Sequence, residues 1–209
     1  MVIMGLCVFA FLAQRGTQGQ LTVDGLLRGP SVANGEYWRI VTSAFLHGRF
    51  MHIGFNMWAL WVFGKPLEET VGRLRFGLIY LAGLLGGALA VLAFNFTTPT
   101  LGASGAVLGC AGAFAAVLWA RGIKIWETSL GFIFLLNLGL PLLPGVNISF
   151  WGHFGGMVAG FAAGWLLYLL PSRNRDLSNN LVVGAGAGLA VLLAIGTVVV
   201  SASGGLLSL

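Results

Sequence analysis

Charged residues are scarce in this sequence, and their scarcity excludes most classes of soluble protein. Only 8% of the 209 residues are charged, against about 25% in a typical soluble domain, and 57% are hydrophobic. So few charges cannot cover the surface of a water-soluble protein, which excludes a soluble enzyme and a disordered linker. The eleven cations are spread along the chain and form no basic patch, so we expect no nucleic-acid partner. What remains is a polytopic membrane protein.

Cysteine is also rare, and motifs for metals or nucleotides are absent. Cys7 and Cys110 lie in apolar runs without the spacing of a metal site, so we expect both to serve packing. Neither His47 nor His52 has a neighbouring Glu, and no H-E-x-x-H pattern occurs, which disfavours a zinc protease. The chain also lacks G-x4-G-K-[ST]. We therefore expect no metal and no cofactor.

Long apolar stretches recur along the chain and predict an all-α, polytopic membrane helical bundle. A membrane-spanning helix needs roughly 20 predominantly apolar residues. Seven candidate stretches occur, at about 1–14, 42–63, 76–96, 102–120, 125–143, 150–170 and 181–203. The first is short, because fourteen residues cover only about 21 Å of a roughly 30 Å hydrocarbon core. We expect it to be a real span whose N-terminal part is clipped or short.

The distribution of cations predicts how the chain lies in the membrane. With a cytoplasmic N-terminus, the inner loops carry Lys65, Arg73, Arg75, Arg121, Lys124, Arg173 and Arg175. The outer side then carries Arg15, Arg28, Arg39 and Arg49, all in or beside one long loop. Cytoplasmic loops are enriched in Lys and Arg, so this orientation is favoured, with an external C-terminus. It fits a bacterial inner membrane, with an organelle membrane as the alternative.

The few polar residues within the predicted spans fall at similar depth. His52 and Asn56 lie four residues apart on the second span and share a helix face. Ser104 and His153 lie near the starts of the fourth and sixth spans, which run in the same direction as the second. Ionisable residues inside a membrane indicate a functional site, so we predict that these four meet in the outer half. His47 is about 140° away from His52 around a helix, and we expect a loop or capping role for it.

Glycine recurs along two of these spans at intervals that permit close helix packing. The sixth span has Gly152, Gly156, Gly160 and Gly164, and the fourth has Gly102, Gly105 and Gly109. Such small residues let two backbones approach closely in a membrane. Ser104 and His153 lie beside these stripes. A close crossing would bring Ser104 Oγ within about 3 Å of a His153 nitrogen, as an activated nucleophile requires.

Five short motifs occur in order along residues 36–164. They are E-x-W-R at Glu36–Arg39, H-x4-H-x3-N at His47–Asn56, E-x3-G at Glu68–Gly72, G-x-S-G at Gly102–Gly105, and a His–Gly motif at Gly152–Gly156 followed by Gly160. This ordered set resembles the rhomboid family of intramembrane serine proteases. Gly152 stands where many members have Ala before the histidine.

The resemblance implies a fold and a division of the chain. Residues 1–171 would form a rhomboid-like six-helix catalytic core, with a large external loop at about 15–41. Residues 172–180 would form a cytoplasmic linker, and 181–209 a seventh transmembrane helix with the C-terminus. The structural residues of the motifs would be Trp38, Arg39, Glu68, Gly102, Gly105, Gly156 and Gly160.

The resemblance also implies a reaction. Ser104 would be the nucleophile and His153 the general base and then acid, as a dyad, since no Asp or Glu is placed to orient His153. The backbone N–H of Ser104 and the side chains of His52 and Asn56 would bind the oxyanion. The expected partners are the lipid bilayer and single-span transmembrane substrates, cleaved near the external face.

Three other functions compete with this interpretation. A proteolytically inactive rhomboid-like scaffold would bind membrane proteins, but such relatives lack the serine or the histidine, and this chain has both. A small transporter would spread its polar residues across the membrane depth, whereas here they cluster on one side. A membrane zinc protease would need metal-ligand spacing that is absent.

Overall fold

The computed structural model describes residues 2–144, 147–174 and 176–206, and the prediction of an all-α fold is confirmed. Within these ranges no β-strand forms, and one isolated antiparallel bridge joins Leu27 to Thr100. The principal helices are α1 (Val2–Gly16), α5 (Phe50–Ala59), α7 (Arg73–Phe94), α8 (Ser104–Ala120), α9 (Ser129–Gly139), α10 (Phe150–Gly164) and α12 (Asn179–Ala202). Shorter ones are α2 (Gln20–Gly25), α3 (Gly29–Ala33), α4 (Arg39–Thr42), η1 (Ser43–Phe45), η2 (Leu60–Gly64), α6 (Lys65–Val71), η3 (Ile125–Glu127), η4 (Leu140–Leu142), η5 (Trp165–Leu169) and α11 (Leu170–Arg173).

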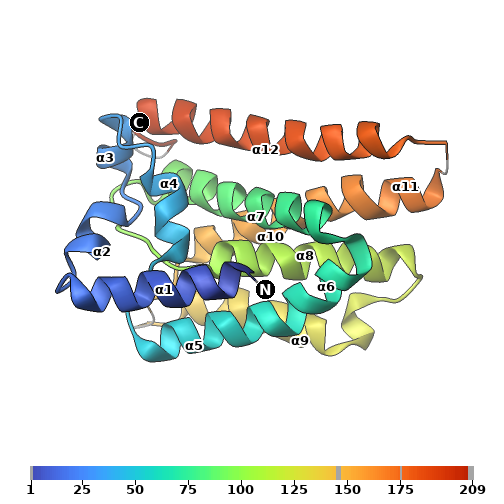
Figure 1. The fold of residues 1–209 in the computed structure, drawn as a ribbon, viewed down its shortest axis with the longest axis horizontal. Helices are drawn as coiled ribbons and strands as arrows, with labels where there is room; N and C mark the ends of the chain where they lie inside the picture. Colours follow the sequence, from blue (N-terminus) through green and yellow to red (C-terminus); the bar gives the residue numbers. More distant parts are fainter. Residues whose placement is uncertain (1, 145–146, 175, 207–209) are drawn as a thin grey trace.

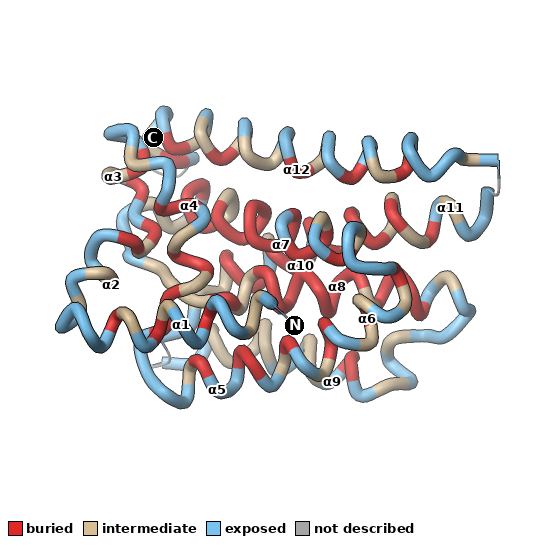
Figure 2. The backbone as a smooth tube through the Cα atoms, in the orientation of Figure 1, coloured by how far each residue is buried: buried red, intermediate tan, exposed pale blue. Residues whose placement is uncertain are grey.

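The long helices lie side by side, with α7, α8 and α10 at the centre of the bundle (Figure 1). These three carry most of the buried residues (Figure 2). Helices α5, α8 and α10 all begin at the end of the bundle where α2 and α3 lie (Figure 1). The second, fourth and sixth spans therefore run in the same direction, as the sequence predicted.

Three helices are long and apolar enough to cross a membrane within the described ranges. They are Arg73–Phe94, Phe150–Arg173 and Asn179–Ala202. Shorter apolar helices occupy Val2–Gly16, Ser104–Ala120 and Ser129–Leu142. In the span Phe150–Arg173, the π-helical turn η5 joins α10 to α11 without interrupting the helical path.

The second predicted span was placed wrongly at both ends. Instead of a continuous helix from residue 42, α4 and η1 are followed by an extended turn, and α5 begins only at Phe50. The turn forms because Leu46 and Arg49 both adopt extended backbone angles, so no helical ladder can pass through them. At its other end the helical path continues through η2 and α6 to Val71. It stops at Gly72, whose φ of 84° suits glycine.

Glycine lets the backbones of α8 and α10 touch along their length. A Cβ atom added to Gly105 would lie 3.1 Å from the carbonyl oxygen of Gly152, and one added to Gly156 would lie 2.9 Å from the Cα of Gly105. Lower in the interface, a Cβ on Gly160 would collide with the backbone of Gly109. Apart from Gly102, which lies in the loop before α8 and faces His52, both predicted stripes therefore lie in one helix–helix interface.

Helix α7 adds a third glycine surface, which the sequence analysis did not single out. A Cβ on Gly83 would lie 2.9 Å from the Cα of Gly109 on α8. One on Gly87 would lie 2.9 Å from the carbonyl oxygen of Gly152 on α10. The backbones of α7, α8 and α10 thus approach one another closely in the N-terminal halves of α8 and α10.

Helix α12 packs along α7 and is fastened at its start by an arginine. Arg75 donates one guanidinium hydrogen bond to the carbonyl of Leu167 (2.8 Å) and another to Oδ1 of Asn179 (2.7 Å). The outward face of α12 carries exposed apolar side chains, including Leu192 and Val199. This pattern is typical of a helix that faces lipid on one side and protein on the other.

We predict that Gly160→Ala destabilises the fold. The added Cβ collides with the backbone of Gly109, so α8 and α10 must separate, at a cost of about 1–3 kcal/mol for overpacking. The measurement is the thermal unfolding midpoint in detergent. The matched control is Gly188→Ala on α12, where nothing lies within 4 Å of the added atom. Equal midpoints for the two variants would contradict the prediction.

Candidate active site

Ser104 is the first residue of α8 and is half-buried at the end of the bundle. The preceding loop reaches it through Gly102, whose φ of 125° lies outside the range that other residues adopt comfortably. The Gly102 N–H donates to the carbonyl of Ser43 (2.9 Å), and Thr100 exchanges two backbone hydrogen bonds of 2.9 Å with Leu27. The large loop between α1 and α5 therefore fixes the segment that leads into Ser104.

The backbone around Ser104 offers free hydrogen-bond donors. The first helical bond of α8 runs from the Val107 N–H to the Ala103 carbonyl (2.9 Å). The N–H groups of Ser104, Gly105 and Ala106 precede it and have no partner within the helix. A helix N-terminus also carries a partial positive charge, so this position favours a developing anion.

His153 lies in the first turn of α10 and is buried, with 5% of its surface exposed. The turn is capped by Ser149, whose Oγ accepts from the Gly152 N–H (3.1 Å). His153 Nδ1 lies 3.0 Å from the backbone carbonyl of Asn137, at the end of α9. Because a carbonyl only accepts, Nδ1 must carry a proton, so in the neutral ring Nε2 keeps the lone pair. This neutral tautomer is the one that a general base requires.

The packing of α8 on α10 brings Ser104 and His153 to the same level. Gly105, directly after Ser104, lies against Gly152 and Gly156, which flank His153 in the sequence. Within the described ranges no hydrogen bond joins the Ser104 hydroxyl to His153. Catalytic hydrogen bonds are often long in the absence of substrate, so the dyad stays a prediction at this stage.

His52 lies in the first turn of α5, at the same end of the bundle as Ser104, and Asn56 follows one turn further along the helix. A Cβ on Gly102 would lie 2.7 Å from both Cε1 and Nε2 of His52, so this ring covers the loop before Ser104. Asn56 is buried and donates one amide hydrogen to the His52 carbonyl (2.9 Å), which leaves its second amide hydrogen available.

His47 lies in the turn before α5, as expected for a loop residue, and not on the helix. Its ring packs edge-on against His52, with the ring centroids 5.1 Å apart. Its Nδ1 lies 3.2 Å from the Phe45 carbonyl, and its Nε2 accepts from the Ala103 N–H (3.5 Å). His47 therefore touches both the oxyanion candidate His52 and the residue before Ser104.

Arg39 organises the large loop rather than the reacting centre. Its guanidinium is buried, pairs with Glu36 and donates to the carbonyls of Val23 (2.7 Å) and Leu26 (3.1 Å). Trp38 is exposed, and its indole N–H donates to the Asp24 carbonyl (3.2 Å). This geometry suits the structural role that the motif implies for both residues.

Glu68 lies far from Ser104, in α6 at the opposite end of the bundle (Figure 1). Its backbone carbonyl accepts from the Gly72 N–H (2.9 Å), where the second span ends. Within the described part of the chain, no three His, Cys, Asp or Glu side chains gather in a group that could hold a metal ion.

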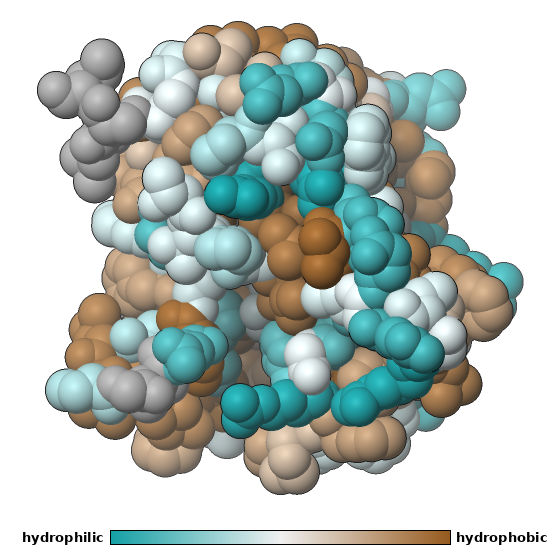
Figure 3. All heavy atoms as spheres, turned by 90° about the vertical axis from the view of Figure 1, so that its left-hand side faces the viewer, coloured by the Kyte–Doolittle hydropathy of each residue, from teal (hydrophilic) through white to brown (hydrophobic). Residues whose placement is uncertain are grey.

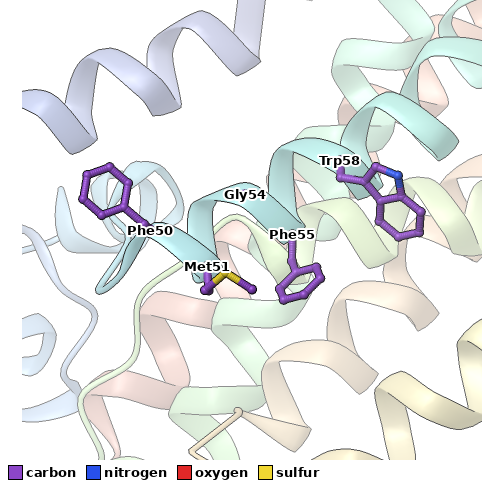
Figure 4. Close-up of a pocket in the computed structure, with 5 residues that line it drawn as sticks. All are labelled: Phe50, Met51, Gly54, Phe55 and Trp58. Carbon is purple, nitrogen blue, oxygen red and sulfur yellow. The ribbon is translucent and has the colours of Figure 1, made fainter.

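A shallow apolar groove lies on the outward face of α5 (Figure 4). It is lined by Phe50, Met51, Gly54, Phe55 and Trp58. The four large side chains are each more than half exposed. Helix α5 packs on α1, α8 and its own continuation η2, and makes no extensive contact with α9 within the described ranges.

Two features of the site were not predicted from the sequence. The Asn137 carbonyl that orients His153 has no sequence signature, because every residue has a backbone carbonyl. The Ser149 cap could have been found, since a serine three residues before Gly152 fits the helix N-cap pattern.

Comparison with protein families gives one matching domain. A family model described as "Rhomboid domain" matches residues 34–170. The matched segment contains all five motifs and every candidate site residue from Trp38 to Gly160. Helix α12, all of α1 and residues 17–33 of the following loop lie outside it.

Comparison with curated proteins gives relatives in bacteria and plants. "Rhomboid protease GluP" of Bacillus subtilis (strain 168) is 37% identical over 146 residues, which are 68% of this chain and 28% of that protein. "Putative rhomboid protease YdcA" of the same bacterium is 32% identical over 148 residues, or 69% of this chain and 73% of that protein. "RHOMBOID-like protein 6, mitochondrial" of Arabidopsis thaliana is 35% identical over 162 residues, or 75% and 52%. The chain thus spans about half or less of two of these three relatives.

Proposed function

Because this chain belongs to the rhomboid family, we propose that it is an intramembrane serine protease that works through a Ser104–His153 dyad. It is an integral membrane protein, with three helices of spanning length in the described ranges. The observation that carries the proposal is the hydrogen bond between His153 Nδ1 and the Asn137 carbonyl. It leaves Nε2 unprotonated on the side chain that shares its level with Ser104.

In the first half of the reaction, Ser104 Oγ attacks the carbonyl carbon of the scissile peptide bond. The hydroxyl proton passes to His153 Nε2, and a bond forms between Oγ and the carbon. The carbonyl oxygen becomes an oxyanion. The Ser104 N–H at the start of α8 and the side chains of His52 and Asn56 would donate to it. The C–N bond then breaks, and His153 gives its proton to the leaving amine.

The second half of the reaction needs water. His153 takes a proton from a water molecule, whose oxygen bonds to the acyl carbon. The bond between that carbon and Ser104 Oγ then breaks, and His153 returns the proton to Oγ, which frees Ser104 and the new carboxyl group. Ser104 is half-buried at the end of the bundle, where hydrophilic side chains gather among apolar ones (Figure 3). That end supplies water to a site that lies below the membrane surface.

The cations support an external position for the site. At the opposite end from Ser104 lie Lys65, Arg73, Arg75, Arg121, Lys124 and Arg173. Arg175, counted with them in the sequence, lies outside the described residues. We propose that this end is cytoplasmic, as in a bacterial inner membrane, and that residues 172–180 link the six-helix core to the seventh helix on that side.

The substrate we propose is a single-span protein cleaved near the external face. Such a helix can approach laterally between α5 and α9, along the apolar groove of α5 (Figure 4). A helical peptide bond is shielded by its own hydrogen bonds, so the substrate must unwind locally before Ser104 can reach it. Near the outer end of the membrane, water can satisfy the freed backbone groups. The glycine-lined site favours a small residue before the scissile bond.

An inactive scaffold that binds membrane proteins is the alternative function, with a small transporter as a weaker one. A scaffold would have the same fold but no reactive serine. Reaction with a fluorophosphonate probe, which modifies activated serines, separates these alternatives from a protease.

We expect Ser104→Ala and His153→Ala each to abolish both probe labelling and cleavage of a membrane-embedded substrate. Each removes one partner of the proton transfer and leaves the helix interface unchanged. Labelling is read on a gel, and folding is checked by the thermal midpoint. Ser201→Ala, at a buried serine of α12, is the control and should retain full activity. Substantial activity in Ser104→Ala would exclude Ser104 as the nucleophile.

We expect His52→Ala and Asn56→Ala to lower kcat more than they raise KM. Loss of one oxyanion donor typically costs about 10²- to 10³-fold in kcat. Kinetics in detergent with a fluorogenic transmembrane substrate would measure both constants. Thr197→Val removes a buried hydrogen bond on α12 and serves as the control. Defects confined to KM in both variants would indicate substrate positioning instead.

We expect Asn34→Cys to react with a membrane-impermeant maleimide in intact cells, and Lys124→Cys to react only after lysis. Both positions are exposed, at opposite ends of the bundle. The native Cys7 and Cys110 are buried, so background labelling should be low. The reverse pattern would place the site on the cytoplasmic face.

We expect substrates to be cleaved more slowly when helix-breaking residues just below the cut are replaced by Leu. Gly and Pro disfavour a helix by about 1 and 3 kcal/mol relative to Ala, so their loss makes unwinding harder. Initial cleavage rates across such a substrate series are the measurement. Unchanged rates would reject the unwinding step but not the serine chemistry.

A further inference from the structure

A buried glutamine near the end of α1 joins three segments that are distant in the sequence. Gln14 has only 5% of its surface exposed and lies outside the matched family segment and all five motifs. Its Oε1 accepts from the backbone N–H of His47 (3.0 Å), and its Nε2 donates to the Thr22 hydroxyl (2.7 Å). The proposed reaction gives it no role.

The contacts of His47 continue from this glutamine to the nucleophile. His47 is almost fully buried, with 1% of its surface exposed. Its Nδ1 bonds to the Phe45 carbonyl, which fixes Nε2 as an acceptor. Nε2 receives the N–H of Ala103, directly before Ser104. A chain of contacts therefore runs from Gln14 through His47 and Ala103 to Ser104.

We propose that Gln14 is a positioning residue for Ser104, acting through His47. An unpaired buried N–H costs the full desolvation of that group, so without Oε1 the His47 turn must shift towards water. That shift would withdraw the His47 ring from Ala103 and change the angle at which the chain enters α8. The inference rests on the proposed function, because its test uses the reactivity of Ser104 as a nucleophile.

A purely structural glutamine would fasten α1 to the large loop through Thr22, without acting on Ser104. The positioning role and the structural role can be tested separately, because the Gln14 amide makes its two hydrogen bonds with different atoms. Oε1 serves His47 and Nε2 serves Thr22. Thr22→Val removes one bond and leaves the other, whereas Gln14→Met removes both in a side chain of similar shape.

The test measures the rate at which a fluorophosphonate probe labels Ser104 in the full-length protein, well below the thermal midpoint of every variant. We expect Gln14→Met to label about 10- to 100-fold more slowly, as small misplacements of a reacting group typically cause. Thr22→Val should label near the wild-type rate. Gln14→Glu retains an oxygen for His47 and should restore most of the rate. Gln20→Met is the matched control, since the Gln20 amide is exposed and bonds only to Asp24.

The outcomes are distinct. Equal slowing in Gln14→Met and Thr22→Val, or an unchanged rate in Gln14→Met, would overturn the positioning role. If Gln14→Met does not fold, Gln14→Asn takes its place, because its side chain is one methylene too short to reach His47. An unlabelled wild-type protein would reject the proposed protease, and the positioning role with it. Ser104→Ala confirms that any signal comes from that serine.

Discussion

Helices α8 and α10 touch backbone to backbone, and the geometry of the site depends on this contact. In a membrane, lipid tails are as apolar as leucine, so helices do not associate by excluding water. Close packing between small residues supplies the attraction instead. Gly105 against Gly152 and Gly156 sets the relative height of the two helices, and the residues beside these glycines are Ser104 and His153. Larger residues in this interface would move the two helices apart and so separate Ser104 from His153.

Helix packing alone does not fix Ser104, because it stands at the very start of α8. The loop before it is held from outside the helix, by hydrogen bonds to Leu27, Ser43 and His47. These partners belong to the large loop between α1 and α5, which Arg39 ties together through carbonyls at Val23 and Leu26. The loop therefore helps to position Ser104, the proposed nucleophile, although none of its side chains need touch a substrate.

In the proposed mechanism no carboxylate orients His153. In a Ser–His–Asp triad a buried acid orients the histidine and stabilises its charged form. Here a neutral backbone carbonyl, that of Asn137, sets the orientation. An ionised acid would be costly to bury at this depth, whereas a carbonyl at a helix end needs a donor in any case. The carbonyl belongs to α9, so any displacement of α9 would also act on His153.

The sequence by itself determined the fold class and most of the helical segments, and it predicted the residue types of the site. These follow from local properties: apolar stretches of spanning length, glycine at every fourth residue, and a serine and a histidine beside those glycines. Only the tertiary structure decided that α5 begins at Phe50 and that His47 lies before it, because extended angles at Leu46 and Arg49 depend on what the turn packs against. The α7 glycines, the Asn137 carbonyl and the Gln14–His47 bond also came from the structure alone. Each is a contact between residues far apart along the chain, and in the last two a backbone group takes part, which carries no mark in the sequence.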